Sequence, residues 1–211
     1  MLNSMVINKP PGSKWHPPHQ DAFYVPMRPI EKILTAWTAV DPVFETNGSL
    51  FVVPGSHKEN IIHPEVNVPD LTNIMYFMIP DVDAVAPYNK RVTVAPMEPG
   101  DTVFFHPLLV HGSWPNTSNM FRKAITSLYV SQESYYIDVK GTPLEAFEKS
   151  LNEVIKGMYG PDVGEIVSMI TTKINKRTIN MDYDPQYALN FFRERPRHQF
   201  RGLFFPNRTH E

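Results

Sequence analysis

The stretch GDTVFFHPLLVHGS, residues 100–113, contains two short apolar runs and a histidine that is followed at once by glycine. Pro99-Gly100-Asp101 predicts a turn, and Thr102–Phe105 then predicts a strand. The second run, Leu108–Val110, leads directly to His111. An apolar strand that ends in a histidine and a glycine suits a side chain aimed into the mouth of a cavity. These residues therefore predict a β-rich fold with a functional histidine at the end of a strand.

Short strands separated by turns extend over residues 1–140, with no helical pattern between them. Asp41-Pro42 ends one run, and Asn47-Gly48 predicts a hairpin turn before the next. The 21 prolines favour short strands, edges and turns over long helices. This pattern predicts a mainly β fold, a double-stranded β-helix (jelly roll, cupin-like). The expected strands are Met1–Asn8, Ile33–Val40, Ser49–Val53, Arg91–Ala95, Thr102–Phe105 and Arg122–Ser131.

The pattern becomes helical after Gly141. Thr142-Pro143-Leu144-Glu145 has the form of a capping box with proline at the first helical position. Apolar residues then recur at helical spacing until Gly160-Pro161 ends the run, and a weaker helix is expected over residues 163–175. We expect both helices to pack one apolar face on the barrel. The expected division is 1–140 for the jelly-roll core, 141–177 for a helical buttress and 178–211 for a poorly ordered or packed extension.

The overall composition is that of one globular domain. The chain has 211 residues, of which 42% are hydrophobic and 20% are charged. A net charge of −2 and a pI near 6.4 provide no basic field for nucleic acid or an anionic membrane. Arginine and phenylalanine alternate after residue 178, a pattern that also occurs where proteins stack on single-stranded nucleic acid, but the acidic balance favours a packed or poorly ordered tail.

Cysteine is absent from the sequence. This excludes disulfides, thiolate zinc sites, iron–sulfur clusters and a cysteine nucleophile. Any metal must therefore be held by His, Asp or Glu, which suit iron, manganese or zinc. The longest apolar run, Ile74–Ile79, is far shorter than the ~20 residues of a membrane-spanning helix. We expect no membrane span and no secretory signal.

His19-Gln20-Asp21 is the first candidate for chemistry. In an extended chain, side chains two residues apart point the same way, so His19 and Asp21 can share one metal ion. Taken alone, each candidate has a simpler interpretation. The H-x-D motif suits a solvated loop, His111 a hydrogen-bonded barrel histidine, and Arg122 a surface ion pair.

The combination of these residues is more specific than its parts. Two imidazoles and one carboxylate occupy one face of an octahedral Fe(II) and leave three positions open. 2-Oxoglutarate can chelate through two of them, which leaves the third for O₂. Its far carboxylate then requires a bidentate cation, and Arg122 lies eleven residues after His111. His16 and His106 are rival ligands by residue type, and His57 more plausibly serves a loop.

Several longer segments carry a resemblance to a known family. They are Ile7-Asn8-Lys9-Pro10-Pro11, His16-Pro17-Pro18-His19-Gln20-Asp21, Ala36-Trp37-Thr38-Ala39, Asn47-Gly48, Pro54-Gly55-Ser56-His57-Lys58, Gly100–Ser113, Phe121-Arg122-Lys123-Ala124 and Tyr136–Thr142. With these segments the chain resembles the phytanoyl-CoA dioxygenase family. The resemblance extends to about residue 142 and weakens through the helical region.

This resemblance implies specific roles for seven residues. His19, Asp21 and His111 would ligate iron, and Arg122 would bind the cosubstrate carboxylate. The residues that would further line the cosubstrate pocket are Ser113, Trp37 and Met5. Each of these three has an ordinary alternative, since Trp37 and Met5 suit a core and Ser113 can cap a turn.

The implied activity is 2-hydroxylation of phytanoyl-CoA or a similar branched long-chain acyl-CoA in fatty acid α-oxidation. It would use Fe(II), 2-oxoglutarate and O₂, with ascorbate as an activator, in the peroxisome. Asp21 favours hydroxylation over halogenation, because a related halogenase has a small residue there. Members of the family carry a further region before this segment, including a lysine that helps to bind 2-oxoglutarate, so we expect the N-terminal part to be absent. The alternatives are an oxygenase for another small apolar substrate and a truncated, non-catalytic form.

Overall fold

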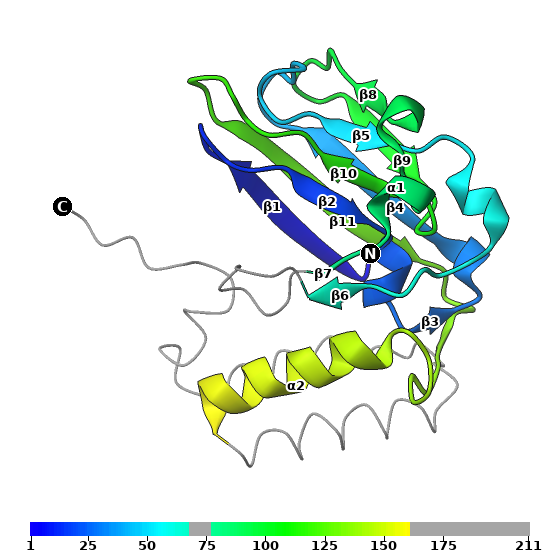
Figure 1. Cartoon of the computed structure of the whole chain (residues 1–211). Helices are drawn as coiled ribbons and strands as arrows, with labels where there is room; N and C mark the ends of the chain where they lie inside the picture. The colour runs from blue at the N-terminus through cyan, green and yellow to red at the C-terminus, as the bar shows by residue number, and fades with distance from the viewer. Residues whose placement is uncertain (68–76, 161–211) are drawn as a thin grey trace. The chain divides into compact units, whose positions relative to one another are not determined.

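The computed structural model describes residues 1–67 and 77–160, which are mainly β with few helices (Figure 1). Two four-stranded antiparallel sheets form the body of the fold. The first sheet consists of β1 (Asn3–Lys9), β11 (Arg122–Val130), β4 (Ile33–Ala39) and β9 (Thr102–Phe105), in that order. The second consists of β2 (His16–His19), β10 (His111–Ser113), β5 (Leu50–Val52) and β8 (Val92–Val94), in that order.

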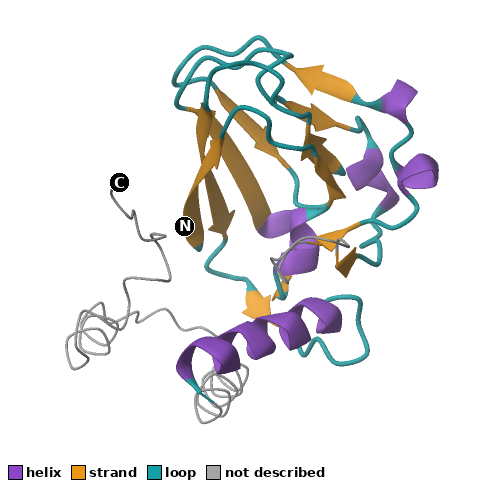
Figure 2. Ribbon diagram, turned by 60° about the vertical axis from the view of Figure 1, so that its left-hand side comes forward, coloured by secondary structure: helices purple, strands orange, loops and turns teal. Residues whose placement is uncertain are grey.

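The two sheets lie face to face, and the chain passes repeatedly from one to the other (Figures 1 and 2). Apolar side chains of both sheets meet in one core cluster, which contains Trp37 of β4, Leu50 of β5 and Ala124 of β11. β11 alternates as predicted, with Ala124 and Leu128 buried and Lys123 exposed. Alternate residues of β11 therefore face the interior between the sheets.

Shorter elements complete the described part of the chain. Two small antiparallel sheets pair β12 (Tyr135–Tyr136) with β3 (Met27–Arg28) and β6 (Val66–Asn67) with β7 (Phe77–Met78). The helices are α1 (Val82–Val85) and α2 (Glu145–Tyr159), and the 3₁₀ turns are η1 (Asp21–Tyr24), η2 (Ile30–Lys32), η3 (Ser56–Glu59) and η4 (Tyr88–Lys90). None of the described helices has the length and apolarity that crossing a membrane requires.

All six predicted strands are confirmed, each within two residues of its predicted ends. Two further strands of the second sheet were not predicted, β2 and β10. Prolines 17 and 18 hide β2, yet they are tolerated because His16 and His19 make the paired positions with β10. The predicted strand Leu108–Val110 is wrong. These residues form a buried turn closed by the Leu109 N–H to the His106 carbonyl at 2.8 Å, so His111 begins its strand instead of ending it.

The predicted hairpin at Asn47-Gly48 is also wrong. The turn exists, with Gly48 at φ +86°, but the strands on either side of it, β4 and β5, belong to different sheets. The Asn47 side chain stabilises this crossing by donating to the Pro42 carbonyl at 2.9 Å and accepting from the Phe44 N–H at 2.8 Å. A turn that leads from one sheet to the other places Gly48 close to the ends of β1 and β11.

Helix α2 begins two residues later than the capping box predicts. Its first flanking residue is Leu144, and no side chain caps it. The Thr142 hydroxyl accepts from the Leu144 N–H at 3.3 Å, and the Glu145 carboxylate accepts from the Gly141 N–H at 2.9 Å, so both side chains stabilise the preceding turn. The predicted helix over 163–175 and the extension 178–211 lie outside the described residues.

Candidate metal centre

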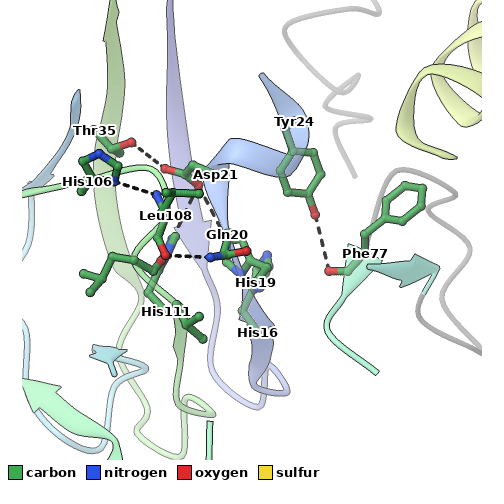
Figure 3. Close-up of polar contacts among 12 residues, drawn as sticks. His16, His19, Gln20, Asp21, Tyr24, Thr35, Phe77, His106, Leu108 and His111 are labelled. Atoms are coloured by element: carbon green, nitrogen blue, oxygen red, sulfur yellow. Dashed lines mark hydrogen bonds and ion pairs between the residues drawn. The ribbon is translucent and has the colours of Figure 1, made fainter. Parts of the chain in front are cut away.

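Three predicted ligands converge between the two sheets. His19 ends β2, Asp21 begins η1 and His111 begins β10, and one ligand atom from each lies within 4.8 Å of the other two (Figure 3). The Asp21 Oδ1 atom is 3.6 Å from His111 Nε2 and 3.9 Å from His19 Nε2. Two imidazole nitrogens and one carboxylate oxygen at these distances suit a single divalent metal ion of the iron or manganese type.

Backbone carbonyls orient both imidazole rings. The Nδ1 atom of His19 lies 3.0 Å from the Pro17 carbonyl, and that of His111 lies 2.9 Å from the Leu109 carbonyl. In this arrangement each Nδ1 carries the proton and each Nε2 keeps its lone pair for the metal. His19 and His111 are also opposite each other in the β2–β10 pair, with ring centroids 4.3 Å apart. Strand register therefore sets the distance between the two nitrogen ligands.

Asp21 is held by the neighbouring sheet. The Thr35 hydroxyl on β4 donates to Asp21 Oδ2 at 2.6 Å, which leaves Oδ1 facing the imidazoles (Figure 3). Gln20 has φ −124° and ψ +130°, an extended conformation, so His19 and Asp21 point the same way as the H-x-D motif predicted.

The surroundings keep the imidazole of His19 neutral. Burial, and after it the nearby His111, lower the pKa of His19 to about 4, although Asp21 and the Pro17 carbonyl oppose them in part. At pH 7 the ring is therefore unprotonated, which is the form that ligates metal.

A buried cationic side chain, that of Arg122, lines the same cavity. The cavity has a volume of about 420 Å³ and is lined by the three ligands and by Arg122, Ser113, Trp37 and Met5. The Arg122 guanidinium is 2% exposed, lies 5.1 Å from the Trp37 ring and donates through Nε to the Gly48 carbonyl at 3.1 Å. Its Nη1 atom has no hydrogen-bond partner within the described part of the chain. Burial lowers the pKa of Arg122 to about 10, so the group is charged at neutral pH.

All seven residues singled out from the sequence therefore face one cavity. Met5 differs from the rest because 55% of it is exposed, which puts it at the mouth. Of the rival histidines, His16 lines the cavity with its ring 4.4 Å from that of His19, but it is not part of the ligand group. His106 lies outside the cavity lining, where its Nδ1 accepts from the Leu108 N–H at 3.1 Å and its ring lies 5.8 Å from that of His57.

Gln20, the middle residue of the H-x-D motif, was missed by the sequence analysis. It is fully buried and links three segments. Its backbone N–H donates to Glu65 at 2.8 Å, and its side chain donates to the Leu108 and Ile61 carbonyls and accepts from the His63 N–H. These bonds join the H-x-D motif to the turn before His111. No local pattern reveals them, because the partners are more than forty residues away in the sequence.

Lys9 is the second residue that was missed. It ends β1, is only 8% exposed, and donates from Nζ to the Ser113 hydroxyl at 2.8 Å. Burial, and after it the charge of Arg122, lower the pKa of Lys9 to about 8. Alternation along β1 contained the signal, because Met5, Ile7 and Lys9 share one face of the strand.

Gly112 separates His111 from Ser113 and has no room for a side chain. A Cβ atom there would lie 2.5 Å from the His16 carbonyl oxygen and 2.5 Å from Cζ of Phe51. We expect Gly112→Ala to lower the free energy of unfolding by about 1–3 kcal/mol, because β10 must move away from β2. Urea denaturation measures this change.

Gly157 on α2 supplies the matched control for Gly112. Nothing lies within 4 Å of a Cβ built there, so Gly157→Ala should leave stability unchanged or raise it by up to about 1 kcal/mol. Equal stability changes for the two variants would contradict the packing argument.

Comparisons of this sequence with a family model and with curated proteins point to the same family. A family model described as Phytanoyl-CoA dioxygenase (PhyH) matches residues 1–124. The bovine (Bos taurus) protein named "Phytanoyl-CoA dioxygenase, peroxisomal" is 44% identical over 164 residues, which cover 75% of this chain and 48% of the relative. A Caenorhabditis elegans protein named "Probable phytanoyl-CoA dioxygenase" is 42% identical over 161 residues, which cover 74% and 50%. The chain thus spans about half the length of the curated relatives it matches.

Solved structures of similar fold have lower sequence identity to this chain than the curated relatives have. EvdO2 from Micromonospora carbonacea var. aurantiaca, complexed with 2-oxoglutarate, is 26% identical with a TM-score of 0.51, covering 63% of this chain and 51% of that one. The non-heme alpha ketoglutarate dependent carbocyclase SnoK from nogalamycin biosynthesis is 29% identical with a TM-score of 0.50, covering 64% and 51%.

Proposed function

The chain belongs to the phytanoyl-CoA dioxygenase family, and we propose that it is an Fe(II)- and 2-oxoglutarate-dependent dioxygenase. One observation supports this most strongly. A single cavity is lined both by a His-Asp-His ligand group and by a buried arginine whose Nη1 atom has no hydrogen-bond partner in the described part of the chain. A ligand that spans them must chelate a metal and present an anion, and 2-oxoglutarate does both.

The residues present fit iron. The donor set is two imidazole nitrogens and one carboxylate oxygen, which leaves coordination positions open for other ligands. When bound there, iron would supply the O₂-dependent oxidation that converts 2-oxoglutarate to succinate and CO₂ and hydroxylates the substrate. The contribution of Thr35 would be to fix Asp21, and that of the Pro17 and Leu109 carbonyls to fix the imidazoles.

The spacing along β10 also supports a dicarboxylate. His111 and Ser113 are two residues apart on one strand, so their side chains point the same way with Cα atoms roughly 7 Å apart. A five-carbon diacid bridges that spacing. Its near end would reach the metal and its far carboxylate would meet Ser113 and the planar fork of Arg122. Trp37 lies against the guanidinium and would hold its plane in place.

The strand arrangement supports the jelly-roll assignment for residues 1–140. Along the chain, the eight strands of the two large sheets alternate between the sheets except at β5 and β8, which follow one another and both belong to the second sheet. We propose that they form a double-stranded β-helix with the metal centre in its interior. Residues 141–177 would then buttress it, as α2 begins to do where the Phe147 ring lies 4.9 Å from that of Tyr24.

The cavity mouth favours an apolar substrate. Met5, Val25, Leu128 and Phe147 are among the residues that line the cavity, and they would shield the reacting carbon from water. We propose 2-hydroxylation of phytanoyl-CoA or a similar branched long-chain acyl-CoA, the step that begins α-oxidation of such acids. Oxygen would enter at the carbon next to the thioester, with succinate and CO₂ as the other products. The peroxisomal location in the bovine relative's name is proposed for this chain too.

A substrate panel tests this proposal. Succinate release should be measured with Fe(II), 2-oxoglutarate and ascorbate, in the presence of phytanoyl-CoA, palmitoyl-CoA or free phytanic acid. We expect phytanoyl-CoA to stimulate release at least about tenfold over palmitoyl-CoA, because one well-packed branch contributes about 1–3 kcal/mol of discrimination. Equal stimulation by free phytanic acid would indicate instead an oxygenase for another small apolar substrate.

A thermal melt separates an oxygenase from a non-catalytic form of the domain. Fe(II) and 2-oxoglutarate together should raise the melting temperature of the protein, because both bind the native state. No shift and no succinate release with any substrate would contradict the proposed function.

A further inference from the structure

Lys9 and Arg122 are neighbours at the end of the β1–β11 pair. They occupy opposite positions in the register, Lys9 as the last residue of β1 and Arg122 as the first of β11. Both are buried, at 8% and 2% exposure. We propose that Lys9 is a second binding residue for the distal carboxylate of 2-oxoglutarate, an inference that rests on the proposed function.

The ammonium group of Lys9 lies next to the cavity through its bond to Ser113, although Lys9 itself is not among the lining residues. Its Nζ atom donates to the Ser113 hydroxyl at 2.8 Å, and Ser113 lines the cavity beside Arg122. An ammonium has three N–H donors, and this bond uses one of them. A carboxylate seated between Ser113 and Arg122 therefore lies within reach of a second cation.

The charges of Lys9 and Arg122 have no counterion among the described residues. Within residues 1–67 and 77–160, neither Lys9 nor Arg122 forms an ion pair, and Arg122 Nη1 has no hydrogen-bond partner. Burial lowers the pKa of each group, and the charge of Arg122 lowers that of Lys9 further. Two adjacent buried cations destabilise the native state unless an anion binds between them.

Gly48 lies against both the Arg122 and the Lys9 side chains. The Gly48 carbonyl accepts from Arg122 Nε at 3.1 Å, and a Cβ atom on Gly48 would lie 2.6 Å from Lys9 Cδ. The Asn116 side chain also donates to the Lys9 carbonyl at 3.0 Å. The glycine thus holds one cation and makes room for the stem of the other, which distinguishes Lys9 from a mobile surface lysine.

A pair of cations predicts a preference for diacids. A 2-oxo acid without a distal carboxylate can still chelate a metal ion, but it gains nothing from Lys9 or Arg122. The matched ligands are therefore 2-oxoglutarate and 2-oxopentanoate, which share a chain of five carbons and differ in the terminal carboxylate. The contribution of Lys9 is the change that its removal makes in the ratio of their affinities.

The experiment is calorimetric titration of both ligands into the Mn(II)-loaded protein. We expect Lys9→Met to weaken 2-oxoglutarate binding by about 10- to 100-fold and to change 2-oxopentanoate binding by less than about twofold. Lys9→Gln keeps a donor for Ser113 without the charge, and we expect the same selective loss. Lys9→Arg should restore part of the affinity, and Lys14→Met, a change at an exposed lysine, should have no effect.

Two results would overturn the inference. Unchanged 2-oxoglutarate affinity in both Lys9→Met and Lys9→Gln would show that the ammonium does not contact the ligand. An equal loss for both ligands would show that Lys9 only shapes the cavity. Failure of the unsubstituted protein to bind 2-oxoglutarate would instead contradict the proposed function, so the two failures are distinguishable. A melt without ligand would reveal whether Lys9→Met folds. If it does not, the affinities of Lys9→Gln for the two ligands alone test the inference.

Discussion

Replacement of Asp21 by alanine is expected to reduce succinate release by about a thousandfold or more, equivalent to roughly 4 kcal/mol. Asp21 is the single carboxylate of the ligand group, and its Oδ1 atom lies within 3.9 Å of both imidazoles. Without it the site has two imidazole nitrogens and no carboxylate oxygen, which weakens binding of a divalent ion. Turnover assays at saturating Fe(II), together with calorimetric metal titration, measure both consequences.

The loss should come from the site and not from unfolding. Asp21 accepts one side-chain hydrogen bond, from the Thr35 hydroxyl, so its removal should cost about 1 kcal/mol of stability. Asp83→Ala removes an exposed carboxylate elsewhere and serves as the control. Succinate release by Asp21→Ala within about threefold of that of the unsubstituted protein would contradict the ligand assignment.

Replacement of Arg122 by methionine is expected to weaken 2-oxoglutarate binding by about a hundredfold or more. The variant loses the planar fork that would pair with the distal carboxylate, and a bidentate charge-assisted contact contributes about 3 kcal/mol. Stability without ligand should change by less than about 2 kcal/mol. The lost Nε bond to Gly48 is offset by removal of a buried charge whose Nη1 atom has no hydrogen-bond partner within residues 1–67 and 77–160. Titration and ligand-free melts measure the two quantities.

A large loss of 2-oxoglutarate affinity with little change in stability is the result expected for a residue that binds the ligand. A purely structural Arg122 would give the reverse result, with a large loss of stability and an unchanged affinity per folded molecule. Arg122→Lys should recover only part of the binding, since an ammonium cannot reproduce the bidentate geometry.

The sequence predicted those parts of the fold that depend on local patterns. Alternation and turn residues located six strands, and Arg122–Val130 has the buried face that its apolar residues predicted. The two strands that carry the histidine ligands were harder to predict from the sequence. β2 contains two prolines, which are tolerated because only His16 and His19 are paired, and β10 has three residues, too few to show alternation.

Some residues of the candidate site could likewise be predicted from the sequence, and others could not. The spacing of His19, Asp21, His111 and Arg122 was enough to predict that these residues lie together. Gln20 and Lys9 were missed for different reasons. Gln20 has partners 41 to 88 residues away, which no local pattern contains. Lys9 shares a strand face with Met5, so its inward direction was predictable, but its contact with Ser113 depends on a residue 104 positions away.

The most direct test of the central claim is titration of 2-oxoglutarate into the protein with and without a divalent metal. We predict one binding site per chain, whose affinity rises at least about tenfold with Mn(II) or anaerobic Fe(II), because the two ends of the ligand then bind together. The gain should vanish in Asp21→Ala. Binding that is equally strong without metal, or absent in its presence, would contradict a cavity in which the His-Asp-His group and Arg122 hold one ligand.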